Sequence, residues 1–208
     1  RTPISRIKFR LEILSSDTLQ ESSIKSIQGI HSDINEVSGL LKEALEFDRS
    51  GRVWHKELIS LKAVIASIIS DLSVEHGDVT LKLSAKEDCE LVQDATQIRR
   101  LLLNIIQNAC KYGSGLVEVH LERRSKQYWI NIDDNGSGIE DSQKESVFSP
   151  FTRIETSRNK QTGGMGLGLA IAKNICHLAG ISMTLTDSPL GGARFSLCFT
   201  IQEVEGDE

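Results

Sequence analysis

The chain has 208 residues and a formal net charge of −5, with 39% hydrophobic and 25% charged residues, proportions that are ordinary for a soluble globular protein. It carries no basic block, which argues against a nucleic-acid partner, and no apolar run approaches the roughly 18 residues that a membrane-spanning helix needs. The four cysteines have no ligand-like spacing, so we expect buried thiols of a reduced cytosolic protein.

Residues 1–50 carry a helical pattern in which apolar residues recur at steps of three and four, with a polar break at "SSDTLQESS". Two helices with a short connection predict an antiparallel hairpin. Each helix has one apolar stripe, which a second copy would bury in a four-helix bundle; packing onto the rest of the chain is the alternative. The stretch "DRSGR" at 48–52 is the expected boundary with a second domain over 53–203, and 204–208 form an acidic tail.

Helical and strand patterns mix in the second domain. Helices are predicted at "LKAVIASIIS", from a capping box at Asp94 and Gln97 through Lys111, and from about Gly166 to Ala179. Period-two strands are expected at "VTLKLS", "LVEVHLE", "QYWINID", "ISMTLTD" and "ARFSLCFTI", with a hairpin around 124–126. Helices on one face of a mostly antiparallel sheet make an α+β fold, an α/β sandwich of two layers.

Asn104, Asn108 and Lys111 in "LLLNIIQNACKYG" are spaced i, i+4 and i+7 and therefore share a helix face, away from the apolar stripe. An asparagine carbonyl is a hard oxygen ligand suited to Mg²⁺, and lysine is a compact charge suited to phosphate. A ligand-binding face and an ordinary solvated polar face are both compatible with this spacing.

A second motif, "IDDNGSGIE", follows a predicted strand and contains Asp134, Gly136 and Gly138 as D-x-G-x-G. Glycines at a strand end let another group approach the backbone, and a carboxylate there can accept a hydrogen bond from an amine. Because Asp-Asn-Gly is also strong turn chemistry, an ordinary turn is the alternative.

A third motif, "TGGMGLGLAIAKNI", runs from four glycines directly into a predicted helix. The unpaired N–H groups and the positive end of the helix dipole favour an anion there. The pattern is neither a Walker loop nor a Rossmann fingerprint. A flexible linker is the alternative, although the helical phase of the apolar residues favours an anion site.

The order of these motifs resembles the catalytic half of a bacterial sensor histidine kinase. "NIIQNACKY" is similar to the N box, "DNGSGI" to the G1 box, "VFSPFTR" to the F box, "GGMGLGLAI" to the G2 box and "GGARF" to the final glycine motif. The opening "RTP" is similar to the end of the H box, His-Glu-x-Arg-Thr-Pro. The resemblance covers nearly the whole chain.

The resemblance implies a dimerisation and histidine-phosphotransfer hairpin, followed by an ATP-binding sandwich of the Bergerat type. It implies that Asn108 ligates Mg²⁺ beside Asn104, which is a candidate catalytic residue. It also implies that Tyr112 and Ile139 flank the adenine ring of ATP. Asp134 would then accept a hydrogen bond from the exocyclic amine of adenine. The implied lid lies between Phe151 and Gly163. The full implied ATP-binding set is Asn108, Lys111, Tyr112, Asp134, Gly136, Gly138, Ile139, Arg153, Thr162, Gly164, Met165, Gly166, Leu167, Gly168 and Leu169.

The resemblance also implies a homodimer, a response-regulator receiver domain as partner, and a role for Thr2 in removing phosphate from that regulator. None of the five histidines precedes an acidic residue, so the implied acceptor lies three residues before Arg1, and this chain alone is predicted not to phosphorylate itself. The missing initiator methionine predicts a longer protein. The family implies an inner-membrane protein whose cytoplasmic portion this is, attached only through upstream segments.

Two other functions stay open: an ATPase of the same fold, and a non-catalytic nucleotide-sensing or dimerisation scaffold. Hydrolases of this fold, such as Hsp90, gyrase and MutL, carry a glutamate where Asn104 stands. An amide cannot act as a general base near neutral pH, so the residue favours phosphoryl transfer, which depends mostly on positioning and charge neutralisation. The sequence does not identify the stimulus, the cognate regulator, or whether transfer within a dimer is cis or trans.

Overall fold

The chain divides into two units, Arg1–Gly51 and Arg52–Glu208. The computed structural model describes residues 54–152 and 166–201, all within the second unit. The predicted helical hairpin and the acidic tail lie outside the described residues. So do five of the predicted site residues, namely Thr2, Arg153, Thr162, Gly164 and Met165.

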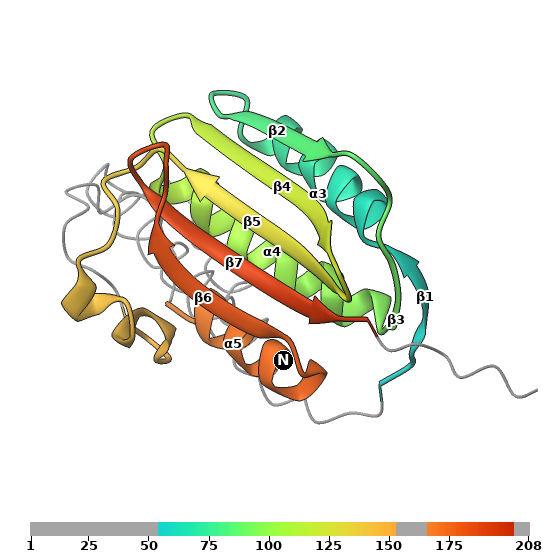
Figure 1. The fold of residues 1–208 in the computed structure, drawn as a ribbon. Coiled ribbons are helices and arrows are strands. Elements are labelled where there is room, and N and C mark those ends of the chain that lie inside the picture. The colour runs from blue at the N-terminus through green and yellow to red at the C-terminus, as the bar shows by residue number, and fades with distance from the viewer. Residues whose placement is uncertain (1–53, 153–165, 202–208) are drawn as a thin grey trace, which may run out of the picture. The chain divides into compact units, whose positions relative to one another are not determined.

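A five-stranded sheet forms one layer of the second unit (Figure 1). The strand order is β2-β4-β5-β7-β6. Only the β2–β4 pair is parallel, and the other three pairs are antiparallel. The strands are β2 (Thr80–Ala85), β4 (Leu116–Arg124), β5 (Gln127–Asp134), β6 (Ser182–Asp187) and β7 (Ala193–Thr200).

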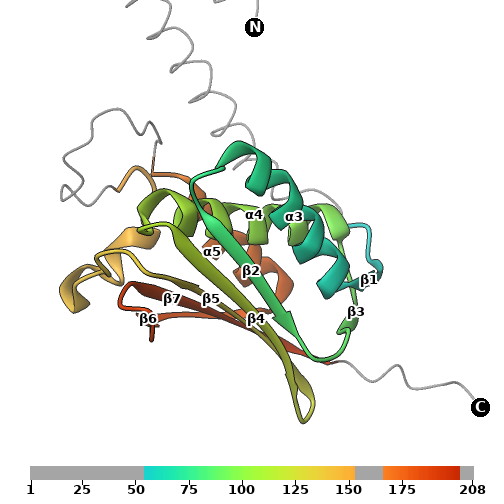
Figure 2. The same cartoon turned by 90° about the horizontal axis from the view of Figure 1, so that it is seen from above.

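Three helices cover one face of this sheet (Figures 1 and 2). They are α3 (Leu61–Glu75), α4 (Ala95–Tyr112) and α5 (Gly168–Ala179), and two short 3₁₀ turns, η2 (Asp141–Gln143) and η3 (Ser146–Phe148), follow β5. Helices on one face of a mostly antiparallel sheet confirm the predicted α+β sandwich. A small sheet of β1 (Glu57–Ser60) and β3 (Glu90–Gln93) was not predicted, because strands of four residues carry little periodic signal.

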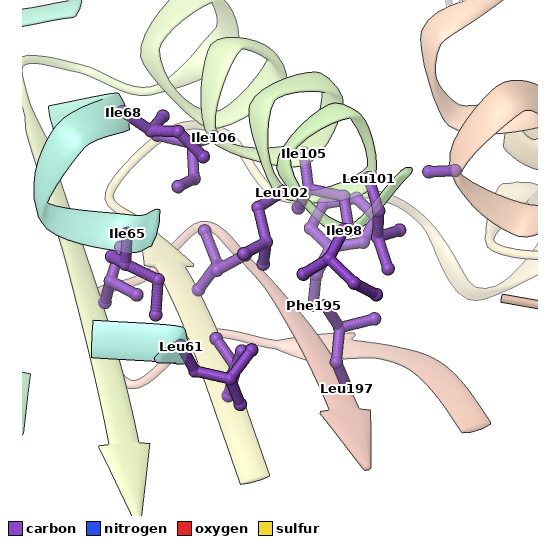
Figure 3. Close-up of a cluster of buried hydrophobic side chains, with 14 of the residues drawn as sticks. Leu61, Ile65, Ile68, Ile98, Leu101, Leu102, Ile105, Ile106, Phe195 and Leu197 are labelled. Atoms are coloured by element: carbon purple, nitrogen blue, oxygen red, sulfur yellow. The ribbon is translucent and has the colours of Figure 1, made fainter. Parts of the chain in front are cut away.

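The core lies between the helices and the sheet. Ile98, Leu101, Leu102 and Ile105 of α4 are fully buried (Figure 3), as the apolar stripe predicts. The inward residues of the strands alternate with outward ones, so that Phe195 and Leu197 of β7 meet the helix residues in this cluster. Burial of this continuous apolar surface is the main term that holds α4 against the sheet.

The ends of the helices follow local sequence signals. Asp94 Oδ1 accepts from the Gln97 backbone N–H at 3.0 Å and caps α4, but Gln97 Oε1 has no partner among the described residues, so only half of the predicted capping box forms. Gly180 ends α5 in the left-handed conformation, as predicted. The helix α5 begins at Gly168, two residues later than expected, because Gly166 has a φ of +73° and cannot belong to a right-handed helix.

Candidate functional site

Asp134, at the carboxyl end of β5, is a buried polar residue of the site. Its side chain is 4% exposed. Its Oδ1 accepts from the backbone N–H of Gly136 at 2.9 Å and from that of Ala193 at 3.2 Å. Among the described residues no hydrogen bond reaches Oδ2, which therefore remains able to accept from a ligand.

Burial raises the pKa of Asp134 above its ordinary value, and the neighbouring charge of Asp133 acts in the same direction. The two backbone N–H groups oppose this rise, because they favour the charged carboxylate. The site therefore holds an acceptor that is costly to ionise but oriented by the main chain before any ligand arrives.

Glycines surround this carboxylate where a side chain has no room. A Cβ on Gly136 would lie 2.2 Å from the Tyr112 carbonyl oxygen, and a Cβ on Gly192 would lie 2.0 Å from Asp134 Oδ1. Gly192 also donates its N–H to the Asp134 carbonyl oxygen at 3.2 Å. The chain therefore brings three backbone segments together here: the end of α4, the end of β5 and the turn before β7.

The end of α4 lies close to this carboxylate, because a Cβ on Gly136 would lie 2.2 Å from the Tyr112 carbonyl oxygen and 3.0 Å from Asp134 Oδ1. Asn104, Asn108 and Lys111 are half-buried, and Tyr112 is 42% exposed. The Asn108 side chain forms no hydrogen bond within the described residues, so its amide oxygen is available for a ligand. The Lys111 ammonium lies 5.1 Å from the Tyr112 ring centroid, a cation–π contact that holds it at the end of the helix.

Asn104 is less available than the spacing predicts. Its Nδ2 donates to the Arg100 carbonyl oxygen at 2.8 Å, one turn back along α4. Its Oδ1 faces Gly168, where a Cβ would lie 3.0 Å away. The residue thus joins α4 to the first turn of α5, and Gly168 is the position that permits this close approach.

The amino terminus of α5 carries no side-chain cap among the described residues. Leu167 and Leu169 flank its first residue, and Gly166 accepts a hydrogen bond at its carbonyl oxygen from the Phe151 N–H at 3.0 Å. The first N–H groups of an uncapped helix and its dipole favour an anion. The start of α5 is thus an uncapped helix terminus, and an anion bound there stays a prediction.

Gly138 and Ile139 follow the carboxylate in the turn after β5. Gly138 has a φ of +72°, which favours glycine, and a Cβ there would lie 3.6 Å from the Gly192 carbonyl oxygen. Ile139 is half-buried against the core. The described residues of the three predicted motifs thus gather around the ends of α4 and β5 and the start of α5.

Asn135 is a residue of this region that the sequence reasoning missed. Its Oδ1 accepts from the backbone N–H groups of Ser114 at 2.9 Å and Leu116 at 3.0 Å, so it fastens the loop between α4 and β4 to the end of β5. The Asp-Asn-Gly turn signal contained this residue, because asparagine side chains readily bind nearby backbone groups. The long-range partners of Asn135 could not be read from that signal.

The four cysteines are buried and free, as predicted, and burial raises the pKa of Cys110 to about 11 and that of Cys176 to about 12. Within residues 54–152 and 166–201, no group of three or more His, Cys, Asp or Glu side chains is placed to hold a metal ion. No helix in those same residues is long and apolar enough to cross a membrane.

The donor set fits the nucleotide that the motifs imply. Asp134 Oδ1 is held by two backbone N–H groups, so Oδ2 can accept from an amine. Asn108 offers one hard oxygen ligand, and Mg²⁺ is commonly held by one or two protein groups together with substrate phosphates.

Comparison with known proteins gives matches to one family. Residues 93–203 match the model of the histidine kinase-, DNA gyrase B- and HSP90-like ATPases. The chain is 31% identical to the sensor protein RstB of Escherichia coli over 210 residues, which is 97% of this chain and 46% of that protein. It is 30% identical to the sensor histidine kinase YkoH of Bacillus subtilis over 211 residues, which is 99% of this chain and 46% of that protein.

Solved structures give the same fold. The ATP-binding domain of PrrB from Mycobacterium tuberculosis aligns with a TM-score of 0.60 at 27% identity, covering 71% of this chain and 98% of that one. Full-length ShkA in complex with AMPPNP aligns with a TM-score of 0.73 at 20% identity, covering 97% of this chain and 44% of that one. The chain spans less than half the length of the two curated relatives.

Proposed function

Because the chain belongs to the family of histidine kinase-, DNA gyrase B- and HSP90-like ATPases and carries the ATP-binding catalytic domain of a bacterial sensor histidine kinase, we propose that it binds Mg-ATP and transfers the γ-phosphoryl group to a histidine. The phosphoryl group then passes to an aspartate of a response regulator. In this proposal residues 1–50 form a dimerisation hairpin, in which Thr2 assists dephosphorylation of the regulator. Residues 53–203 form the catalytic domain. The protein acts on the cytoplasmic side of a membrane.

The observation that carries the proposal is the environment of Asp134. A buried carboxylate with Oδ1 fixed by two backbone N–H groups and with Oδ2 left to accept is complementary to the exocyclic amine of adenine. Tyr112 and Ile139 supply apolar surface for the two faces of the ring. Gly136 allows the end of β5 to pack against the Tyr112 carbonyl oxygen, which keeps Asp134 close to the end of α4.

Asn108, Lys111 and the amino terminus of α5 bind the phosphates and the metal ion in this proposal. When bound, Mg²⁺ neutralises charge that develops on the transferring phosphoryl group. Asn108 holds the ion through its carbonyl oxygen, Lys111 contacts phosphate as a point charge, and the N–H groups at the start of α5 orient the phosphate oxygens. Arg153, Thr162, Gly164 and Met165, outside the described residues, complete the predicted contacts to the nucleotide.

Asn104 favours phosphoryl transfer to a protein group over hydrolysis. Its amide donates to the backbone of α4 and lies against Gly168, and an amide cannot take a proton from water near neutral pH. Transfer to an incoming imidazole places its main demands on positioning and charge neutralisation. The ATPase alternative would need another general base at this place.

Asp134→Asn tests the nucleotide site. The amide can still accept from Gly136 and Ala193 through its oxygen, but its nitrogen then meets the adenine amine as a second donor. We expect ATP affinity, measured by titration calorimetry with Mg²⁺ present, to fall at least about tenfold, because a hydrogen bond to a charged group is lost. Asp71→Asn, the same change on an exposed carboxylate of α3, is the matched control and keeps the wild-type affinity. Unchanged affinity in Asp134→Asn would refute the adenine assignment.

Phosphoryl transfer needs its own test. The chain and a version extended upstream by a few dozen residues are incubated with γ-labelled ATP. We expect acid-labile, alkali-stable label only in the extended version, as for phosphohistidine. Label on the present chain that is lost only in His31→Ala would show a different acceptor, and ATP binding without label in either version would favour the scaffold function.

A further inference from the structure

An ion pair lies on the opposite face of the sheet from Asp134 and one residue away along β5. The Asp133 carboxylate is completely buried, and one edge of the Arg194 guanidinium donates to both of its oxygens. Arg194 Nε lies 2.7 Å from Oδ1, and Nη2 lies 2.8 Å from Oδ2. The two residues are direct partners across the β5–β7 ladder. The pair is therefore bidentate and lies within the sheet, with the carboxylate buried and the Arg194 side chain 30% exposed.

The same strand register also determines the position of the Asp134 carboxylate. Successive residues of a strand point to opposite faces, so Asp133 and Asp134 point to different faces, as do Arg194 and Ala193. Asp133 and Arg194 are the last partners at this end of the ladder, where β7 begins beside the end of β5 (Figure 1). The next backbone group along β7, the Ala193 N–H, donates to Asp134 Oδ1.

We propose that Arg194, acting through Asp133, is a positioning residue of the nucleotide site. The ion pair holds the start of β7 against the end of β5, so that Ala193 keeps its hydrogen bond to the Asp134 carboxylate. It also neutralises the buried charge beside that carboxylate. This inference rests on the proposed function, since it assigns a role in binding the base of ATP.

The charges around the pair explain why Arg194 is needed. Glu118 of β4 is the ladder partner of Asp133, and the charge of Glu122 on the same strand acts on Arg194 in the same direction as Asp133 does. Lys82 of β2 pairs with Glu118 at 3.0 Å, and His120 Nε2 lies 3.4 Å from the other oxygen of Glu118. Within the described residues, the cation that contacts Asp133 is Arg194.

The group that would respond is Asp134, whose neighbours on the helix side are the end of α4, at Tyr112 and Gly113, and the glycine turns. Burial and the charge of Asp133 already raise the pKa of Asp134. Without Arg194, the charge of Asp133 acts on Asp134 uncompensated, and the pKa of Asp134 rises further. A protonated Asp134 is a poorer acceptor for the adenine amine, so acid should weaken ATP binding at a higher pH than in the wild type.

The experiment compares ATP affinity from neutral to acidic pH in three variants. For Arg194→Met we expect affinity about tenfold weaker at neutral pH, as for one lost hydrogen bond to a charged group, and a midpoint of acid weakening shifted to higher pH. Arg194→Lys keeps the positive charge but loses the two-donor contact with the carboxylate. We therefore expect an intermediate ATP affinity and a pH midpoint of acid weakening near that of the wild type. The double variant Asp133→Asn/Arg194→Met removes both charges, so its midpoint returns to the wild-type value while its affinity stays reduced.

Two controls separate positioning from general weakening. Lys82→Met removes the neighbouring Lys82–Glu118 pair on the same face and is expected to leave both affinity and midpoint unchanged. Purine riboside triphosphate lacks the exocyclic amine of adenine. Its affinity should therefore not fall with the protonation of Asp134 at acidic pH in any variant. A purely structural role of Arg194 would lower affinity equally at every pH, and that result would overturn the inference.

The outcomes are distinguishable from failure of the proposed function. If the wild-type protein does not bind ATP, both the proposed function and the inference are refuted. Wild-type protein that binds ATP while a folded Arg194→Met variant keeps its affinity and pH profile overturns the inference alone. Where Arg194→Met does not fold, Arg194→Lys and the double variant decide, because neither leaves an unpaired buried charge; wild-type affinity in both would overturn the inference.

Discussion

The two ends of the proposed nucleotide site are built in different ways. At the adenine end, Asp134 is 4% exposed and a Cβ on either Gly136 or Gly192 would lie within 2.2 Å of a neighbouring oxygen. At the phosphate end, the half-buried Asn108 side chain has no hydrogen bond inside the described residues, and the Lys111 ammonium has the Tyr112 ring as its neighbour at 5.1 Å. Backbone hydrogen bonds fix the first end, whereas side chains form the second.

This difference determines what each end can contribute. A group that is already oriented loses little conformational entropy when a ligand arrives, whereas a free side chain loses about 0.5–1.5 kcal/mol on being immobilised. We therefore expect the adenine end to supply specificity for the base. The phosphate end should respond to the metal ion and to the charge of the ligand.

The largest effect is expected for Gly136→Ala. The new Cβ would lie 2.2 Å from the carbonyl oxygen of Tyr112, a backbone atom that cannot move without shifting the end of α4. Overpacking of this kind costs about 1–3 kcal/mol of folding free energy, and it separates Asp134 from its backbone donor, so ATP binding should be lost. Urea unfolding and titration calorimetry measure the two effects.

Gly77→Ala is the matched control for that substitution, because nothing lies within 4 Å of the new Cβ and Gly77 has no positive φ. It should keep the wild-type stability and affinity. If Gly136→Ala behaved like Gly77→Ala, the adenine end would not be rigid, and the contrast between the two ends would disappear.

The next largest effect is expected for Asn108→Ala at the phosphate end. The substitution removes the proposed Mg²⁺ ligand, so the gain in ATP affinity on adding Mg²⁺ should shrink by about tenfold, as for one lost interaction with a charged group. Affinity without Mg²⁺ should stay near the wild-type value. The free energy of unfolding should change by less than about 0.5 kcal/mol, because the side chain holds no internal hydrogen bond within the described part of the chain.

Calorimetry in the presence of Mg²⁺ or of a chelator gives both affinities for Asn108→Ala. The matched control is Gln107→Ala, since Gln107 carries the same amide group, lies one residue earlier on α4 and is also half-buried. This control should leave the Mg²⁺ dependence intact. An unchanged Mg²⁺ dependence in Asn108→Ala would place the metal elsewhere.

The same contrast explains how far the sequence could predict the molecule. The apolar stripe of α4 and the alternation along β4 and β5 are local patterns, and the resulting helix, strands and two-layer architecture are as expected. Asp134 and Gly136 could be singled out because D-x-G-x-G follows a strand directly. These features depend on residues that are neighbours in the chain.

What the sequence could not predict involves partners far apart in the chain. Ala193 donates to Asp134 across 59 positions, and Arg194 reaches Asp133 across 61, and no local pattern encodes the register that brings them together. The spacing of Asn104 places it on a polar face of α4, but it does not reveal the hydrogen bond to Arg100 one turn back. A periodic pattern shows which face a residue occupies but not whether its polar atoms are already used.

A smaller effect is expected from pH at Asp134, and its sign separates stability from binding. Burial raises the pKa of Asp134 in the folded state, so the folded state holds a proton more readily than the unfolded chain does. The carboxylate therefore lowers stability at neutral pH, and this loss is relieved as the pH falls through the raised pKa. ATP affinity should move the other way, because protonation removes the acceptor.

Asp134→Asn isolates the contribution of Asp134 to the pH dependence of stability, because the amide does not titrate. The stability of the variant relative to the wild type, from urea unfolding, should be greatest at neutral pH and should decrease as the pH falls. A stability difference that stayed constant over the same range would mean that the folded-state pKa of Asp134 is not raised.

The smallest effect is expected for Gly168→Ala, which adds a Cβ 3.0 Å from the side-chain oxygen of Asn104. The neighbour here is a side chain rather than backbone, so a movement of a few tenths of an ångström removes the conflict. Replacing glycine by alanine without strain stabilises by about 0.4–1 kcal/mol, and the contact with Asn104 should cancel most of this gain. In the Asn104→Ala background the contact is absent, so the same substitution should show the full gain by urea unfolding. Equal effects in the two backgrounds would mean that the α4–α5 contact does not restrict Asn104, and that the phosphate end is looser than its geometry indicates.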